Sequence, residues 1–210
     1  MAPLCACQNV SRFFGERAVL RQVSFACAPG ELLYLGGANG AGKTTLLRIL
    51  AGALRATAGA VTVGEAAIGS AAARRATGYL SHQSLLHPAL TVEENLEFYA
   101  ALFDLADARA AVRSALARVG AQGFAQRRAG ELSQGMKQKA ALARCLLHRP
   151  RLLLLDEPFA SLDRATVSEL REILRELRDA GLSVIVTSHQ TEPLEGLVDR
   201  RLELEQGRLR

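Results

Sequence analysis

A glycine-rich segment, Gly37-Ala38-Asn39-Gly40-Ala41-Gly42-Lys43-Thr44, constrains the fold of this chain more than any other feature. It matches the pattern G-x-x-x-x-G-K-[ST], in which glycines let the backbone turn its N–H groups inward around phosphate oxygens. We expect Lys43 to reach the β- and γ-phosphates of a nucleoside triphosphate and the Thr44 hydroxyl to bind Mg²⁺. The apolar run 32–35 predicts a buried strand before the loop, and residues 45–50 predict a helix after it. In that context a plain glycine-rich turn is the weaker interpretation.

Length and composition favour one globular domain. The chain has 210 residues, of which 49% are hydrophobic and 22% charged, and no apolar run approaches the roughly 18 residues that cross a bilayer. We therefore expect it to stay in the cytosol. Its net charge of +5 invites a nucleic-acid hypothesis. Because basic and acidic residues alternate, as in 169–176, we expect solvated helix faces and no nucleic acid, and take the charge as weak evidence for an anionic membrane surface.

Four cysteines are too few and too scattered for a disulfide framework: Cys5, Cys7, Cys27 and Cys145. The pair Cys5-x-Cys7 could bind a soft metal, but no His or Cys lies beside it in the sequence. Packing within a strand is the favoured interpretation.

The first half of the chain reads as strands followed by helices. Runs at 19–28 and 31–35 are separated by the turn signal Pro29-Gly30 and predict an antiparallel β layer before the glycine-rich loop. Short strands follow at 59–64 and from residue 78. Residues 91–120 are predicted to be mostly helical, with a capping box formed by Thr91 and Glu94.

The second half alternates helices and strands. A helix is expected from Ser133 to about His148, a strand at 152–155, a helix from near Asp163 to Gly181, a buried strand at 183–187, and a last β-hairpin at 202–209. Such alternation predicts an α/β fold: a P-loop NTPase core with a mostly parallel sheet, an N-terminal antiparallel β layer and an inserted helical lobe. We expect one domain over 1–210, with the core at about 1–83 and 150–210 and the lobe at about 84–149.

The order of further motifs narrows what the loop alone leaves open among kinases, GTPases, helicases and transporters. After Lys43 come Gln83 behind a strand, Leu132-Ser133-Gln134-Gly135-Met136 at a helix start, Asp156-Glu157 at a strand end, Ser161-Leu162-Asp163, and His189 after another strand. Over nearly the whole chain, this series resembles the nucleotide-binding subunit of ATP-binding cassette transporters.

The resemblance implies a role for each polar residue. Asp156 would hold Mg²⁺ through a water, with Thr44 and Gln83 as further metal-binding residues, and Gln83 would also link the core to the helical lobe. Glu157, one residue along, would be the general base that polarises the attacking water, and His189 would contact the γ-phosphate. The expected ATP-binding set is Gly37, Ala38, Asn39, Gly40, Ala41, Gly42, Lys43, Thr44, Thr45 and Phe14.

The resemblance also makes specific predictions for Phe14 and for the signature segment. Phe14 would stack on adenine, which makes base selectivity loose, and we expect one ring of the pair Phe13 and Phe14 to pack in the core. Ser133 and Gly135 would bind the nucleotide of a second copy, so hydrolysis would need a homodimer. The signature departs from Leu-Ser-Gly-Gly-Gln at Gln134 and Met136, but Ser133 and Gly135 remain, so we expect activity.

The resemblance also implies a membrane partner. A groove around residues 83–103 would receive a helix of an integral-membrane transporter subunit, lined by Leu85, Leu86, Leu90, Phe98 and Tyr99. The chain would then lie peripherally on the cytoplasmic face of the inner membrane. Soluble cassettes that act on nucleic acid, ribosomes or iron–sulfur assembly are the rival class.

The cargo is suggested by two segments and by the short stretch after His189. Residues 94–100 and 187–190 are similar to the ATP-binding subunit of the haem exporter of bacterial cytochrome c biogenesis. Exporters of drugs, lipids or polysaccharides share the Glu94-Asn95-Leu96 segment and remain an alternative. No haem-binding pattern is present, so a role in cytochrome assembly would be mechanical.

Overall fold

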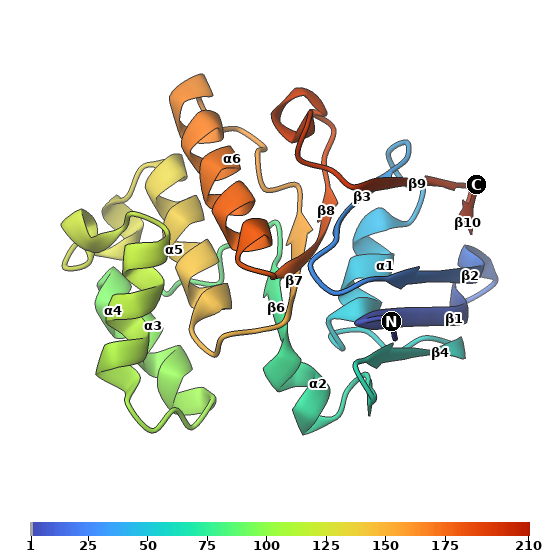
Figure 1. The fold of residues 1–210 in the computed structure, drawn as a ribbon, viewed down its shortest axis with the longest axis horizontal. Coiled ribbons are helices and arrows are strands. Elements are labelled where there is room, and N and C mark those ends of the chain that lie inside the picture. The colour runs from blue at the N-terminus through green and yellow to red at the C-terminus, as the bar shows by residue number, and fades with distance from the viewer. Residues whose placement is uncertain (1) are drawn as a thin grey trace.

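Two β-sheets organise the computed structural model, which describes residues 2–210 (Figure 1). An antiparallel sheet has the strand order β2-β1-β4-β5, and a six-stranded sheet has the order β10-β9-β3-β8-β7-β6. The first comprises β1 (Cys5–Phe14), β2 (Arg17–Cys27), β4 (Ala58–Val63) and β5 (Ala66–Ala67). The second comprises β3 (Leu32–Gly36), β6 (Thr77–Leu80), β7 (Leu152–Asp156), β8 (Ser183–Thr187), β9 (Arg200–Glu205) and β10 (Arg208–Leu209). All pairs of the second sheet are parallel except β9 with β10.

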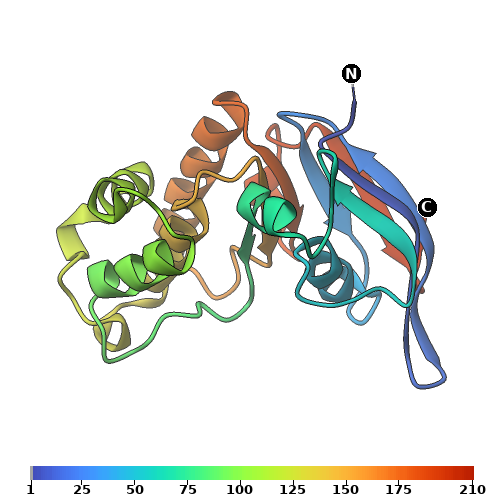
Figure 2. The same cartoon turned by 90° about the horizontal axis from the view of Figure 1, so that it is seen from below.

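Helices cover both faces of the six-stranded sheet. Helix α1 (Lys43–Leu50) lies between the two sheets, as Figure 2 shows from below. On the other face lies α6 (Arg164–Asp179), beside the group formed by α3 (Val92–Leu102), α4 (Ala108–Arg118) and α5 (Gln134–Leu146). The remaining helical elements are α2 (Ala71–Ala76) and 3₁₀ turns at Gln122–Phe124, Ala129–Glu131 and Glu192–Leu194.

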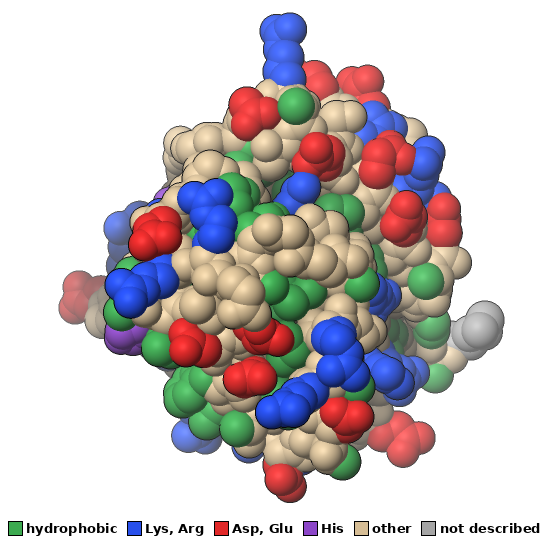
Figure 3. Space-filling view, turned by 90° about the vertical axis from the view of Figure 1, so that its left-hand side faces the viewer, with side chains coloured by type: hydrophobic (Ala, Val, Ile, Leu, Met, Phe, Trp, Pro, Cys, Tyr) green, Lys and Arg blue, Asp and Glu red, His purple; other side chains and the backbone are tan. Residues whose placement is uncertain are grey.

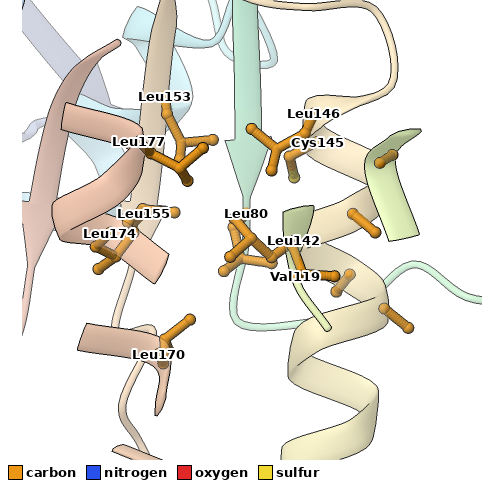
Figure 4. Packing of buried hydrophobic residues seen from close by; sticks show 14 of the residues in the cluster. Leu80, Val119, Leu142, Cys145, Leu146, Leu153, Leu155, Leu170, Leu174 and Leu177 are labelled. Carbon is orange, nitrogen blue, oxygen red and sulfur yellow. The ribbon is translucent and has the colours of Figure 1, made fainter. Parts of the chain in front are cut away.

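The core follows from the two-residue period of the strands. In β7, Leu152 and Leu154 pack in the cluster around α1, whereas Leu153 and Leu155 pack in the cluster that contains α6 and the helical group. Figure 4 shows the second cluster, where leucines of α6 and β7 lie near Leu80 and leucines of α5. Burial on both faces explains why this strand is a continuous run of leucines.

Side-chain caps fix the helix starts that the sequence predicts. Thr91 Oγ1 accepts a hydrogen bond from Glu94 N at 3.1 Å, and Glu94 Oε2 accepts one from Thr91 N at 2.7 Å, which confirms the capping box. Ser133 caps α5, and Asp163 caps α6 by accepting from Thr166 N at 2.9 Å.

The structure refines some predicted boundaries. The helical stretch 91–120 is two helices, because Asp104 adopts a positive φ of 53° that α3 cannot continue through. Helix α5 ends at Leu146, two residues before the expected end. Helices α3 to α5 do lie between β6 and β7 in the chain, as expected of an insertion, and α5 shares a core cluster with the sheet. The residue boundaries of core and lobe stay a prediction.

The cysteines are buried in the core, and the charged side chains of both signs are mixed on the surface. All four cysteines are buried, and burial raises the pKa of Cys5 and Cys7 to about 12, which disfavours the thiolate that binds metal. On the face shown in Figure 3, basic and acidic side chains are mixed, with hydrophobic ones between them. Within residues 2–210, no helix is long and apolar enough to span a bilayer.

Candidate nucleotide-binding and hydrolysis site

The loop between β3 and α1 has the backbone that the glycine pattern predicts. Gly37 and Gly42 have φ values of 136° and 111°, which side-chain-bearing residues rarely adopt. A Cβ at Gly37 would stand 2.3 Å from the carbonyl oxygen of Leu204, and one at Gly42 would stand 2.9 Å from Leu20 Cδ2. Both conformation and space therefore require glycine at these two positions.

Lys43, the first residue of α1, is folded against the loop. Its side chain is buried, and Nζ donates hydrogen bonds to the carbonyl oxygens of Gly37 at 2.6 Å and Ala38 at 3.2 Å. These bonds hold the ammonium group beside the backbone N–H groups of the loop, where a phosphate chain would lie.

Two oxygen-bearing side chains meet next to the loop. Thr44 Oγ1 donates to Asp156 Oδ1 at 3.0 Å, although the two residues are 112 positions apart in sequence. Asp156, at the carboxyl end of β7, is only 3% exposed and also accepts from Thr187 Oγ1 at 3.0 Å. A hydroxyl and a carboxylate in contact form a hard oxygen donor set of the kind that suits Mg²⁺.

Glu157 and His189 form a pair beside this donor set. Glu157 Oε2 accepts from the backbone N–H of His189 at 2.9 Å, and Glu157 Oε1 lies 3.3 Å from Nε2 of the same histidine. Within residues 2–210, no group donates a hydrogen bond to the buried Oε1 atom. Glu157 has a φ of 54°, and its N–H is held by Thr187 O at 3.1 Å and Thr187 Oγ1 at 3.2 Å. A strained backbone over-determined by its neighbours is common at functional sites.

A cavity of about 330 Å³ brings together eight of the predicted residues. Its walls are formed by Arg17, Val19, Asn39, Gly40, Gly42, Lys43, Thr44, Thr45, Glu157 and His189. Arg17 and Val19 were not predicted, because the first lies outside every motif and the second was read only as part of a strand. The signal that could have identified them is their position at the start of the strand that follows Phe14.

Gln83 and Phe14 are among the predicted residues that do not line this cavity. Gln83 follows β6 in an exposed loop, where its carbonyl oxygen accepts a hydrogen bond from Ser81 Oγ at 2.7 Å, and it does not line the cavity. Phe14 ends β1, is 48% exposed, and has the Arg12 guanidinium 4.4 Å from its ring centroid. Phe13 is 42% exposed, so the prediction that one of these two phenylalanines packs in the core is wrong. An edge position at the hairpin end leaves both rings open to solvent.

The signature residues also lie outside the cavity of their own chain. Ser133 accepts from Met136 N at 3.3 Å and caps α5. A Cβ at Gly135 would stand 2.7 Å from Thr166 Cγ2, so glycine at this position also permits close packing of α5 against α6. The hydroxyl and the helix start remain exposed, as a site for a second molecule would require.

A second cavity, of about 490 Å³, lies between the sheet and the helical group. Leu85 and Tyr99 line it as expected, joined by Leu102 and Phe103 and by the basic side chains of Arg74, Arg75 and Arg144. The other three predicted lining residues do not contribute: Leu86, Leu90 and Phe98. We call this cavity the lobe groove.

Comparison with known proteins identifies the family. Residues 20–160 match the family model described as ABC transporter, which is well over half of the chain. The chain belongs to the ABC transporter family. Its matched region includes the glycine-rich loop, the signature segment and Glu157, all within the ATP-binding cassette.

Relatives of this cassette serve different transport systems by name. Linearmycin resistance ATP-binding protein LnrL of Bacillus subtilis (strain 168) is 33% identical over 96% of this chain and 66% of its own length. The aliphatic sulfonates import ATP-binding protein SsuB 2 of Pseudomonas aeruginosa (strain UCBPP-PA14) is 38% identical over 97% of this chain and 73% of its own length. Nod factor export ATP-binding protein I of Rhizobium etli is 37% identical over 95% of this chain and 65% of its own length. The chain thus spans about two thirds of the length of several of its relatives.

Solved structures confirm the fold class. The dimeric post-hydrolysis state of the ATP-binding cassette MJ0796 bound to ADP and Pi superposes with a TM-score of 0.87 at 26% identity, covering 98% of this chain and 96% of that one. CbiO1 from Clostridium perfringens, part of the ABC transporter complex cbiONQ, gives a TM-score of 0.88 at 25% identity, covering 100% and 88%. The predicted P-loop core, antiparallel β layer and helical insertion form the ABC ATPase fold.

Proposed function

We propose that this cassette hydrolyses ATP and transmits the resulting movement to a membrane partner. The observation that carries the proposal is that Lys43, Thr44 and Glu157 line one cavity at the carboxyl ends of β3 and β7, with Asp156 hydrogen-bonded to Thr44 beside it. A cation, two magnesium-type oxygen donors and a carboxylate beside a phosphate-binding loop are the groups that triphosphate hydrolysis needs.

Glu157 is the proposed general base. Its Oε2 is held by the N–H of His189, which leaves Oε1 at the cavity wall free to accept a proton from an attacking water. The new bond joins the water oxygen to the γ-phosphorus, the bond from that phosphorus to the β–γ bridging oxygen breaks, and ADP leaves. Mg²⁺ held by Thr44 and Asp156 would neutralise charge on the β- and γ-phosphates. Gln83 could join that set only after its loop moves.

A second copy of the cassette completes the proposed site. Ser133 and the start of α5 are exposed and lie outside the cavity of their own chain, so they are available to a nucleotide held by another copy. One structural relative is described as a dimer with ADP and Pi bound. Closure of two such cassettes on ATP would produce the movement that the partner receives.

The lobe groove is the proposed receiver for the membrane partner. Exposed apolar side chains gather there, with Leu85 48% and Leu102 64% exposed, beside the basic rim of Arg74 and Arg75. An apolar groove of this kind accepts an amphipathic helix. We place the cassette peripherally on the cytoplasmic face of the inner membrane.

For the cargo we propose haem, exported for cytochrome c biogenesis. This proposal rests on the resemblance of segments 94–100 and 187–190, and within them Asn95 is buried and bonded to the 87–91 loop. The second candidate is export of a drug, lipid or polysaccharide, which the names of the linearmycin resistance and Nod factor export relatives favour. Neither candidate requires the cassette itself to bind the cargo.

Substitution of Glu157 tests the hydrolytic role. We expect Glu157→Gln to keep ATP binding and to lower turnover by about 10²- to 10⁴-fold, the usual contribution of a positioned base. Glu176→Gln on the exposed face of α6 serves as the matched control and should hydrolyse at the wild-type rate. Normal turnover of the Glu157 variant would place the base elsewhere.

Purification from native membranes tests the partner and the cargo. The Glu157→Gln protein, purified with ATP and Mg²⁺, should retain the membrane subunits of its transporter for mass spectrometry. Recovery of subunits of cytochrome c maturation would support haem export, and recovery of a drug- or lipid-type permease would replace the cargo while keeping the mechanism. Recovery of ribosomes in place of membrane proteins would contradict transport.

A further inference from the structure

The cavity described above contains a cation that belongs to none of the sequence motifs. Arg17 is the first residue of β2, paired in register with Phe14 across the β1–β2 hairpin, and its side chain is exposed. It lines the cavity together with Glu157, His189 and residues of the glycine-rich loop. We propose that Arg17 binds the phosphate chain of the nucleotide, an inference that rests on the proposed function.

Strand geometry directs Arg17 toward the phosphate-binding loop. Val19 belongs to the same strand, and its carbonyl oxygen would lie 3.0 Å from a Cβ at Gly42, so β2 packs directly on the loop. Arg17 precedes Val19 by two residues, with the two Cα atoms roughly 7 Å apart, and both residues line the nucleotide cavity. An extended arginine side chain spans that distance, which puts the guanidinium group within reach of a phosphate cradled by the loop.

The guanidinium group of Arg17 has no partner among the described side chains and is therefore available to a ligand. Among residues 2–210, the side chain of Arg17 forms neither an ion pair nor a hydrogen bond with another group. The other cation in the cavity wall, Lys43, is bonded to loop carbonyls, and Glu157 adds a negative charge. A triphosphate brings several negative charges into this space, and the planar fork of arginine matches phosphate oxygens better than an ammonium does.

A neighbouring cavity provides a matched control. It measures about 530 Å³, shares Arg17, Val19 and Gly40 with the nucleotide cavity, and continues over β2 to the β9–β10 hairpin. Arg21, four residues along β2, lines this neighbouring cavity and not the nucleotide cavity, and its side chain is exposed like that of Arg17. The substitution Arg21→Gln removes one positive charge from β2, as Arg17→Gln does, but it does so outside the nucleotide cavity.

Calorimetric titration of the full chain tests the inference. ATP, ADP and adenosine are titrated at low ionic strength with EDTA present, into the wild type, Arg17→Gln, Arg17→Lys and Arg21→Gln. We expect Arg17→Gln to raise Kd for ATP and ADP about tenfold and to leave adenosine binding unchanged, since a lost charge-assisted hydrogen bond has that effect. Arg17→Lys should recover part of the affinity, Arg21→Gln should stay within about twofold of the wild type, and added salt should reduce the difference.

The outcomes separate this inference from the proposed function. If the wild type binds ATP and Arg17→Gln stays within about twofold of it, the role of Arg17 is overturned and the proposed function stands. An equal loss for adenosine, or an equal loss in Arg21→Gln, likewise overturns a phosphate contact. If the wild type does not bind ATP, the proposed function fails and the inference fails with it. Equal melting temperatures of the four proteins establish that each variant is folded.

Discussion

Replacement of Asn95 by alanine should destabilise the fold without touching the nucleotide site. Asn95 is 2% exposed, and its Oδ1 accepts from His87 N at 2.7 Å. Its Nδ2 lies 3.1 Å from His87 O, 3.3 Å from Leu90 O and 2.8 Å from Thr91 O. Two hydrogens on Nδ2 can satisfy two of these carbonyls at once, so the side chain contributes three hydrogen bonds. They hold the segment before α3 in place.

The expected loss is about 3 kcal/mol of unfolding free energy, from roughly 1 kcal/mol for each of the three hydrogen bonds. For a chain of this size that corresponds to a fall in melting temperature of about 6–12 °C. Urea unfolding followed by far-UV circular dichroism measures the free energy, and calorimetric titration with ATP should give the wild-type affinity, since Asn95 does not line the nucleotide cavity. Glu97→Ala, at an exposed position of the same helix, is the control. A loss below about 1 kcal/mol, or one equal to that of the control, would refute the hydrogen-bond account.

Three further predictions follow from the site and the lobe groove. Lys43→Ala should remove most ATP binding, because it deletes the ammonium group beside the phosphates; unchanged affinity in a titration would contradict the assignment of the loop. Ser133→Arg should block hydrolysis while leaving ATP binding intact, as measured by phosphate release and titration, and simultaneous loss of both would indicate a structural role. Burial lowers the pKa of His148, whose ring stacks on Phe103 with centroids 4.0 Å apart. Folding therefore disfavours its protonation, so the stabilisation is present above about pH 6.5 and is lost as the pH falls below that value. Urea unfolding between pH 8 and pH 5 should show a shallower decline for His148→Gln than for the wild type.

Local sequence signals predicted the parts of the site that depend on short segments. The glycine-rich loop requires positive φ at Gly37 and Gly42, and such conformations are encoded by the residues themselves. The cap at Thr91 and the buried strand 152–155 are local in the same sense. Short motifs in the sequence therefore predicted all the residues of the cavity wall except Arg17 and Val19.

The remainder depends on contacts between distant segments. Arg17 reaches the cavity because β2 packs on the loop through Val19, and no pattern within residues 14–20 encodes that contact. The family resemblance predicted that Gln83 would bind the metal together with Asp156. The strands β6 and β7 are neighbours, but Gln83 lies in the exposed loop after β6 and does not line the cavity. Strand order brings the backbones together, whereas the direction of a loop side chain depends on tertiary packing.

The helical lobe and the hydrolytic residues are connected by short polar contacts as well as by the core. Gln138 Nε2 on α5 donates to the carbonyl oxygen of Pro158 at 2.7 Å, one residue after Glu157. Arg144, also on α5, donates to Tyr79 O at 3.1 Å in β6, the strand that leads to Gln83. Helix α5 therefore contacts the segments that carry both residues, and its own start bears Ser133. Because interiors are close-packed, we expect a shift of the Glu157 segment to be transmitted to α5 through these contacts. If a second copy binds at Ser133 as proposed, this helix would link the state of one nucleotide site to the other.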